Sequence, residues 1–207
     1  PGCPLGRTHR VRLHNDVKRF IHIDKTGRRF VAEDAPRDVV RDAVLNAPGA
    51  VAFALVDDDG LRSYNRLIQK ETVMGVESGD AWVADDLASL ARQIGVDPGE
   101  LLATVRKYNV GIRYGIDGCG KDVRNARLIV EPPFWAAYAA MTVHATMGGI
   151  RTTPDAGVLR EDGRVFPGLF AAGEAAGGLH GRNQLGGCGL ADAFVFGKIA
   201  AESAVRE

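Results

Sequence analysis

Glycine is unevenly distributed along this chain of 207 residues, and its pattern restricts the fold more than any other sequence feature. Half of the 26 glycines follow His144, in runs such as Met147-Gly-Gly149, Gly177-Gly178 and Gly186-Gly-Cys-Gly189. Because glycine has no Cβ, its backbone can turn sharply or lie close against another group. The C-terminal third is therefore expected to form tight turns and close backbone contacts around a few regular elements.

The hydrophobic pattern predicts an α/β chain of short strands and amphipathic helices. Asp97-Pro98 is typical of a helix start, because Asp can cap the first turn and Pro is tolerated at the first helical position. Residues 190–203 are almost entirely apolar, which favours a helix buried on most sides. The other expected elements are a hairpin over 19–31, a helix opened by Pro36, strands at 51–56 and 169–172, a helix over 87–94 and an irregular stretch over 110–133.

Charge and cysteine content exclude several classes of protein. Lys and Arg together number 26, as do Asp and Glu, so the chain has no bulk electrostatic attraction to nucleic acid or to an anionic membrane. The apolar stretch 134–143 is too short for a membrane span. The three cysteines lie far apart, which argues against a zinc site or a disulfide framework. We expect a soluble cytoplasmic protein without direct membrane insertion, or a periplasmic one if a signal upstream of Pro1 was removed.

Generic catalytic motifs are incomplete or missing. Gly115-Ile-Asp-Gly-Cys-Gly-Lys121 has the spacing of a phosphate-binding loop, but Asp122 stands where magnesium binding requires Ser or Thr. We interpret this segment as a glycine-rich surface loop. The sequence contains no G-x-G-x-x-G, H-E-x-x-H or G-x-S-x-G motif, so it does not encode a self-contained dinucleotide-binding domain.

Four successive C-terminal segments carry a more specific signal. They are His144–Ile150, Val165–Glu174, Gly177–Gly187 and Leu190–Gly197. In this order they strongly resemble the fumarate reductase family, the FAD flavoproteins that include soluble fumarate reductases, succinate dehydrogenase flavoprotein subunits and related 2-enoate reductases. Segments that more weakly resemble the capping domain of that family are 27–33, 35–38, 96–109 and 132–136.

The resemblance implies three parts of the chain. Residues 1–10 would be a tail, residues 11–142 an α+β capping domain that clamps the substrate, and residues 143–207 the C-terminal portion of a split, Rossmann-like FAD-binding domain. In the family, the first half of that domain carries the G-x-G-x-x-G turn. We therefore expect an N-terminal FAD-binding half as a partner, either as a separate chain or as a missing part of the same polypeptide. This partner, or a self-association of the chain, would cover exposed apolar faces of the C-terminal segment.

The resemblance also implies FAD as the cofactor. Glu174 follows a predicted strand, where its carboxylate can accept hydrogen bonds from hydroxyls of the ribityl or ribose chain. Gly187-Cys-Gly189 leads into a helix whose N-terminal N–H groups would lie by the pyrimidine edge of the flavin. The alternative is a glycine-rich turn with a surface Glu. The implied cofactor-binding residues are Met147, Gly148, Gly149, Gly173, Glu174, Asn183, Gly187, Cys188, Gly189 and Leu190.

The implied chemistry is the reduction, or the formation, of a C=C bond next to a carboxylate. Arg37 matches the family's proton donor, and His144 matches the histidine that binds a substrate carboxylate. Thr146, Arg182 and Gln184 are further substrate-binding candidates. Without the resemblance, Arg37 would be read as an exposed side chain in a common surface ion pair and His144 as a core residue.

One departure from the family pattern concerns the substrate. Gln184 stands where dicarboxylate reductases usually have an arginine that pairs with a carboxylate as a planar fork. Gln184 carries no charge, so a monocarboxylic enoate or a larger unsaturated ligand fits at least as well as fumarate or succinate. Two alternatives remain: a non-catalytic or incomplete flavoprotein fragment that binds a partner, and a ketosteroid-dehydrogenase-like flavoenzyme, against which Arg37 and His144 count. No metal is expected.

Overall fold

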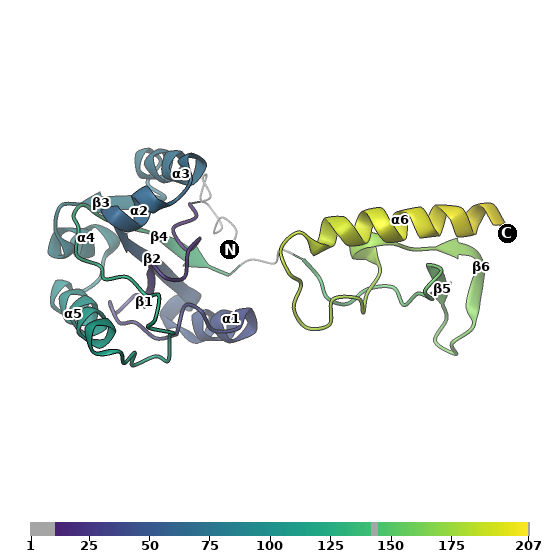
Figure 1. Cartoon of the computed structure of the whole chain (residues 1–207), viewed down its shortest axis with the longest axis horizontal. Helices are drawn as coiled ribbons and strands as arrows, with labels where there is room; N and C mark the ends of the chain where they lie inside the picture. The colour runs from purple at the N-terminus through teal and green to yellow at the C-terminus, as the bar shows by residue number, and fades with distance from the viewer. Residues whose placement is uncertain (1–10, 142–144, 207) are drawn as a thin grey trace. The chain divides into compact units, whose positions relative to one another are not determined.

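The chain divides into two compact units, Pro1–Thr142 and Val143–Glu207 (Figure 1). The computed structural model describes residues 11–141 and 145–206. The division falls where the sequence places the end of a capping domain, and the identity of the two units as capping domain and cofactor-domain segment stays a prediction. The tail 1–10 and His144 lie outside the described residues.

The N-terminal unit is built on a four-stranded antiparallel sheet with the order β1-β2-β4-β3. Its strands are β1 (Ile21–Asp24), β2 (Val51–Asp57), β3 (Ala81–Ala84) and β4 (Phe134–Ala140). The expected strand at 51–56 is confirmed. Because β2 is central and covered on both faces, its sequence is a continuous apolar run rather than an alternating one.

Helices cover both faces of this sheet (Figure 1). On one face, α4 (Leu87–Ile94) and α5 (Pro98–Tyr114) share a core with Phe53 and Leu55 of β2. On the other face, α1 (Arg37–Asn46), α2 (Asp58–Ser63) and α3 (Arg66–Glu77) share a core with Ala54 and Val56. A single 3-10 turn, η1 (Pro48–Ala50), precedes β2. Successive side chains of β2 therefore point to opposite faces of the sheet and contribute to two separate hydrophobic cores.

Local signals placed several helix ends correctly. Asp97 accepts a hydrogen bond from the backbone N–H of Glu100 at 2.8 Å, as expected for an N-cap. Gly95 ends α4 with a φ of 74°, a value that glycine adopts without strain. The helix α3 was not expected from the sequence. Its buried residues are Ile68, Thr72 and Gly75, a face with too little apolar character to give a helical pattern.

The expected hairpin over 19–31 is wrong in its second strand. The strand β1 and the turn after Asp24 form, but only an isolated bridge joins Ile23 to Arg29. The partner of β1 is β2, with Ile21 opposite Leu55. No ladder follows this bridge in the described chain, and the side chain of Arg29 forms buried ion pairs with Glu33 and Asp117.

The C-terminal unit contains a two-stranded antiparallel sheet, a short turn and one long helix. The strands are β5 (Gly157–Leu159) and β6 (Val165–Phe170), followed by the 3-10 turn η2 (Gly173–Ala175) and by α6 (Cys188–Arg206). The strand expected at 169–172 forms earlier and ends at Phe170. The helix α6 packs against η2 and β6.

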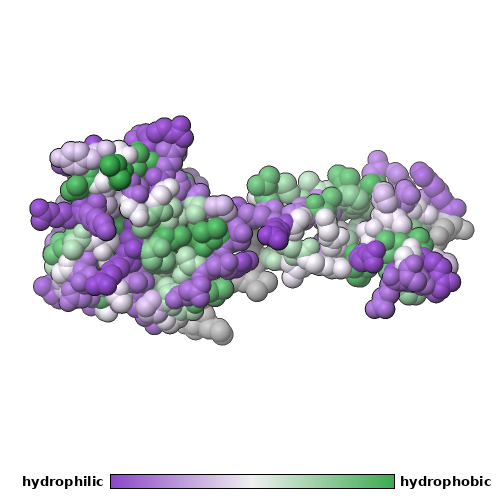
Figure 2. Space-filling model, turned by 90° about the horizontal axis from the view of Figure 1, so that it is seen from below, coloured by the Kyte–Doolittle hydropathy of each residue, from purple (hydrophilic) through white to green (hydrophobic). Residues whose placement is uncertain are grey.

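The helix α6 is confirmed, but its expected burial within this chain is wrong. Asp192 is its buried residue, while Leu190, Phe194, Val195 and Val205 are exposed. A two-stranded sheet offers too little surface to cover a 19-residue helix, and Figure 2 shows apolar surface on this unit. No helix in the described ranges has the length and apolar character that crossing a membrane requires.

Candidate functional site

Two glycine-containing segments of the C-terminal unit lie side by side. Ile150 N–H donates to the carbonyl of Ala175 at 2.8 Å, and Gly177 N–H donates to the carbonyl of Ile150 at 3.0 Å. A Cβ added to Gly149 would lie 2.6 Å from the Ala175 carbonyl oxygen, and one added to Gly177 would lie 2.3 Å from the Gly149 nitrogen. Backbone contact at these distances requires glycine at both positions.

Glu174 lies in η2, just after β6, and its carboxylate is partly engaged. The backbone N–H of Thr146 donates to Glu174 Oε1 at 3.0 Å. No donor from the described residues reaches Oε2, and the residue is exposed. The contact joins the segment around Met147 to the segment after β6 and leaves one carboxylate oxygen available for a hydroxyl or N–H of a ligand.

The start of α6 lies beside the same turn. Gly173 has a φ of +66°, and a Cβ there would lie 3.5 Å from Ala193 of α6. Gly187 has a φ of +88° and accepts hydrogen bonds from the N–H groups of Leu190 and Ala191. The expected glycine turn into a helix is thus present, and a 19-residue helix presents its positive end at Gly187–Gly189.

A polar cluster that the sequence did not indicate lies at this helix start. His180 Nε2 is 3.3 Å from Asp192 Oδ2 and 3.3 Å from Gln184 Nε2. Asp192 is buried, although it belongs to an otherwise apolar stretch of α6. The position of Asp192 in the sequence could have indicated the cluster, because a carboxylate on an apolar helix face requires a polar partner. The cluster holds the Gln184 side chain against Gly189, where a Cβ would lie 2.5 Å from Gln184 Nε2.

The structure places the sequence-derived candidates in three groups. Arg37 is the first residue of α1 in the N-terminal unit and is exposed. Thr146, Met147, Gly148, Gly149, Gly173 and Glu174 form the group around the Glu174 contact. Arg182, Asn183, Gln184, Gly187, Cys188, Gly189 and Leu190 form the loop and first turn of α6. Their roles stay predictions, and His144 lies outside the described residues.

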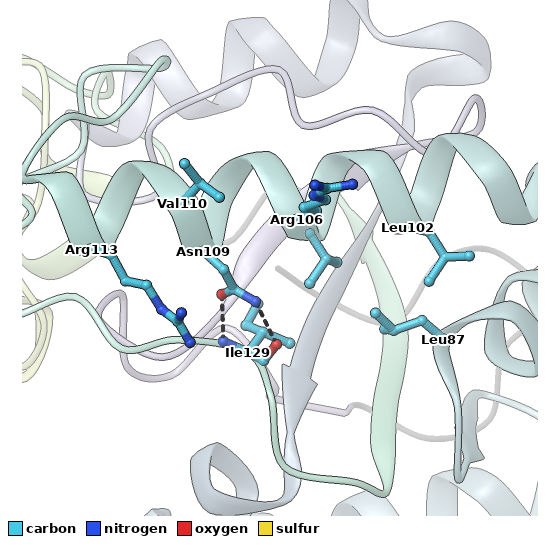
Figure 3. Close-up of a pocket in the computed structure, with 8 residues that line it drawn as sticks. Leu87, Leu102, Arg106, Asn109, Val110, Arg113 and Ile129 are labelled. Atoms are coloured by element: carbon cyan, nitrogen blue, oxygen red, sulfur yellow. Dashed lines mark hydrogen bonds between the residues drawn. The ribbon is translucent and has the colours of Figure 1, made fainter.

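The N-terminal unit has a shallow groove along α5 that contains none of these candidates (Figure 3). Asn109 donates to the carbonyl of Ile129 at 2.8 Å and accepts from its N–H at 2.9 Å, which fixes the loop that forms one wall. Leu87 and Leu102 supply an apolar end and Arg113 a charged one. Among the described residues, no group of three or more His, Cys, Asp or Glu side chains could hold a metal ion.

Comparison with known proteins gives a consistent result. The profile of the family described as "FAD binding domain" matches residues 6–190. The NADH:acrylate oxidoreductase of Vibrio harveyi is 37% identical over 89% of this chain and 18% of that protein. The open conformation of a flavocytochrome c3 fumarate reductase is similar in structure, with a TM-score of 0.75, 30% identity and coverage of 96% of this chain and 34% of that one.

A further similar structure is that of an enzyme named for a steroid substrate. The 3-ketosteroid delta1-dehydrogenase of Sterolibacterium denitrificans superimposes with a TM-score of 0.69 and 26% identity, over 91% of this chain and 39% of that one. The chain spans well under half the length of each of these three proteins. The structural similarity confirms the expected α/β fold of this chain as that of FAD-dependent flavoproteins.

Proposed function

The chain belongs to the family of FAD-binding domains, and from this premise we propose that it is the catalytic C-terminal part of an FAD-dependent oxidoreductase acting on a C=C bond next to a carboxylate. The observation that carries the proposal is the contact of Thr146 with Glu174, beside the close pair Gly149 and Gly177. These residues come from segments that the reductase resemblance assigns to the cofactor. The similarity to an acrylate and a fumarate reductase supports the reaction class.

The residues present fit an FAD. Glu174 Oε2 has no donor among the described residues and can accept from a ribityl or ribose hydroxyl. Gly148 has open space where a Cβ would be, so a ring can approach its backbone. The N-terminus of α6 at Cys188–Gly189 offers N–H groups and a partial positive charge to a region that becomes negative on reduction. FAD, when bound, supplies the hydride from its N5 atom to one alkene carbon.

Arg37 supplies the proton in this proposal. After hydride has reached one carbon, the guanidinium of Arg37 gives a proton to the other carbon, so that the C=C bond becomes CH–CH. A guanidinium is a very weak acid, because its pKa lies far above neutral pH in water. It therefore works only if it is held against the substrate carbon while solvent or neighbouring groups return the proton. His144 holds the substrate carboxylate, which polarises the alkene.

Gln184 favours a monocarboxylic substrate. Its amide nitrogen lies 3.3 Å from His180 Nε2, and the side chain carries no charge for a second carboxylate. Arg182 is two residues away and exposed. We infer that acrylate-like enoates are reduced more efficiently than dicarboxylates such as fumarate.

The test of the reaction uses the chain assembled with the polypeptide that completes the FAD domain. Stopped-flow absorbance follows reoxidation of the reduced flavin by acrylate. Arg37→Ala should slow this step by about 100-fold or more, the range of a lost general acid. Arg41→Ala is the matched control, because Arg41 lies one turn further along α1 and pairs with its neighbour Asp42 at 2.7 Å. Unchanged reoxidation in Arg37→Ala would show that Arg37 is not the proton donor.

The test of the substrate class is Gln184→Arg. A guanidinium at this position should raise kcat/KM for fumarate relative to acrylate by about 10- to 100-fold, the range of a charge-assisted hydrogen bond. Gln184→Lys is the control, since it adds the charge without the planar fork. An unchanged ratio of the two substrates in Gln184→Arg would place the substrate carboxylate elsewhere.

A second candidate function is a partner-binding module without catalysis. The exposed apolar side chains of α6, among them Phe194 and Leu190, favour a partner. In the leading proposal that partner is the N-terminal half of the FAD domain. A purified assembly that lacks the flavin absorbance band and gains none on addition of FAD would favour the module over the enzyme.

A further inference from the structure

The segment that resembles a phosphate-binding loop ends in a buried lysine. The side chain of Lys121 is 1% exposed and lies with three other charged side chains: Glu33 at 0%, Asp117 at 2% and Arg29 at 7%. Two charges are positive and two are negative, so the cluster is neutral as a whole. The sequence predicted a glycine-rich surface loop here. That prediction is wrong for the end of the loop, because Lys121 is buried in the interior.

Glu33 is at the centre of this cluster. It accepts from Arg29 Nε at 2.9 Å and Arg29 Nη2 at 2.6 Å, from the backbone N–H of His22 at 2.9 Å, and its carboxylate is 3.1 Å from Lys121 Nζ. Burial by itself raises the pKa of Glu33, but the hydrogen bond from Arg29 and the charge of Lys121 outweigh it and lower that pKa. Glu33 is therefore ionised and fully bonded at neutral pH.

Lys121 and Asp117 tie Glu33 to two other parts of the chain. Lys121 Nζ donates to the carbonyl of Phe20 at 2.9 Å, next to β1. Asp117 bonds the guanidinium of Arg29 and accepts from the N–H of Lys121 at 2.9 Å. One residue after Glu33, the Asp34 carboxylate accepts from the N–H of Asp122 at 2.8 Å. The loop 117–122 thus fixes the segment that contains Glu33 at several points.

This segment leads directly into the first turn of α1, and Glu33 lies four residues before Arg37. Pro36 is the residue before the helix and gives it no side-chain cap. The fully buried residue of α1 is Val44, in its last turns, whereas in the first turn Arg37 is exposed and Val40 is partly buried against the core. The place of the first turn of α1 therefore depends on the segment before the helix as well as on the packing of Val40.

We propose that Glu33, held by Lys121 and Arg29, is a positioning residue that fixes the first turn of α1 and with it the guanidinium of Arg37. The inference rests on the proposed function of Arg37 as proton donor. Because a small displacement of a catalytic group is sufficient to lower a rate by about 100-fold, a tether four residues away controls turnover without touching the substrate.

The experiment separates this tether from a purely structural role by balancing charge. Glu33→Met leaves Lys121 and Arg29 buried with too few negative partners, which destabilises the domain as a whole. Glu33→Met combined with Lys121→Met removes one charge of each sign, keeps the cluster neutral and replaces both side chains by apolar ones of similar length. The control is Glu100→Met, which breaks the exposed 2.7 Å ion pair with Arg28.

Hydrogen exchange in the complete chain is the readout that does not depend on activity. In the double variant, the amide of Val40, which donates to Pro36 at 3.0 Å, should exchange about tenfold faster than in the wild type, while the amides of β2 keep their protection. Glu100→Met should change neither. Wild-type exchange at Val40 in the double variant, or faster exchange throughout the sheet, would overturn the proposal.

Turnover of the assembled enzyme is the second readout. The double variant should lower kcat for acrylate by about 100-fold with KM within about twofold, because substrate binding is unchanged while the proton donor is displaced. If the double variant kept the wild-type kcat while Arg37→Ala was inactive, the positioning role of Glu33 would be refuted and the proposed function of Arg37 would stand. Full activity of Arg37→Ala would refute the proposed function, and Val40 exchange would still decide whether Glu33 fixes α1.

Discussion

His22 makes the stability of the N-terminal unit depend on pH in a range where few other groups titrate. Its ring is buried beside Phe20, with the ring centroids 4.9 Å apart, and its Nδ1 atom has no hydrogen-bond partner among the residues that the structure describes. Burial lowers the pKa of His22 from its ordinary value of 6.5 to about 4; Glu33 opposes this effect, and the charges of Lys121 and Arg29 add to it. The folded unit therefore holds His22 neutral at pH 5.

The sign and size of the effect follow from proton uptake. Between pH 6.5 and about 4 the unfolded chain takes up a proton at His22 and the folded chain does not, so the free energy of unfolding falls as the pH is lowered. At about 1.36 kcal/mol per pH unit the whole interval corresponds to about 3 kcal/mol. Of this, about 2.5 kcal/mol is lost between pH 7.5 and 4.5, an interval in which ordinary carboxylates titrate only at the acidic end.

The assay is urea unfolding of the full chain at a series of pH values, followed by tryptophan fluorescence. The two tryptophans of the sequence, Trp82 and Trp135, both lie in the sheet of the N-terminal unit, on neighbouring strands. His22→Gln keeps a side-chain N–H near the place of Nε2 but cannot titrate. The wild type should lose about 2.5 kcal/mol more than His22→Gln between pH 7.5 and 4.5. Equal losses in the two proteins would refute the reasoning.

Two further predictions each compare a pair of variants, one pair at adjacent glycines and the other at the N-caps of two helices. Gly149→Ala should lower the FAD content of the assembled enzyme and destabilise its C-terminal unit, because the new Cβ would lie 2.6 Å from a backbone oxygen. Gly148→Ala meets no atom of the chain within 4 Å, so it should leave thermal unfolding of the unit unchanged and lower only the flavin absorbance, because its Cβ would fill the space proposed for the ring. Asp57→Ala should destabilise the N-terminal unit by about 3 kcal/mol in urea unfolding, because the buried carboxylate bonds the N–H groups of Gly60, Val130 and Glu131. Asp86→Ala removes the exposed N-cap of α4 and should destabilise the N-terminal unit by only about 1 kcal/mol. Equal losses of stability in Asp57→Ala and Asp86→Ala would contradict the role assigned to burial.

Much of the N-terminal unit could be predicted from local sequence. The cap at Asp97 and the stop at Gly95 are specified by residues a few positions apart, and the strand over 51–56 is indicated by a continuous apolar run. The helix α3 was missed because its buried face uses Thr72 and Gly75 instead of large apolar residues. Such a face is recognisable only from what packs on it, here Val11 and Ala81 against Gly75.

In the candidate site, too, some features could be predicted from the sequence and others only from the fold. The order of the C-terminal motifs identified Glu174 and the glycines around it, and these residues lie together in the structure. The cluster of His180, Gln184 and Asp192 was not predicted, because a lone histidine and a lone carboxylate in separate segments give no pattern until the fold brings them together.

The sequence by itself determined the α/β class, the end of α4, the start of α5, the glycine turns that lead to α6 and the family of the chain, because these depend on local backbone preference and on motif order. Only the tertiary structure decided that Lys121 is buried, that α6 is exposed and that β1 pairs with β2. The physical reason is distance along the chain. Arg29 and Asp117 are 88 residues apart, and a charge can be buried only where folding supplies its partner.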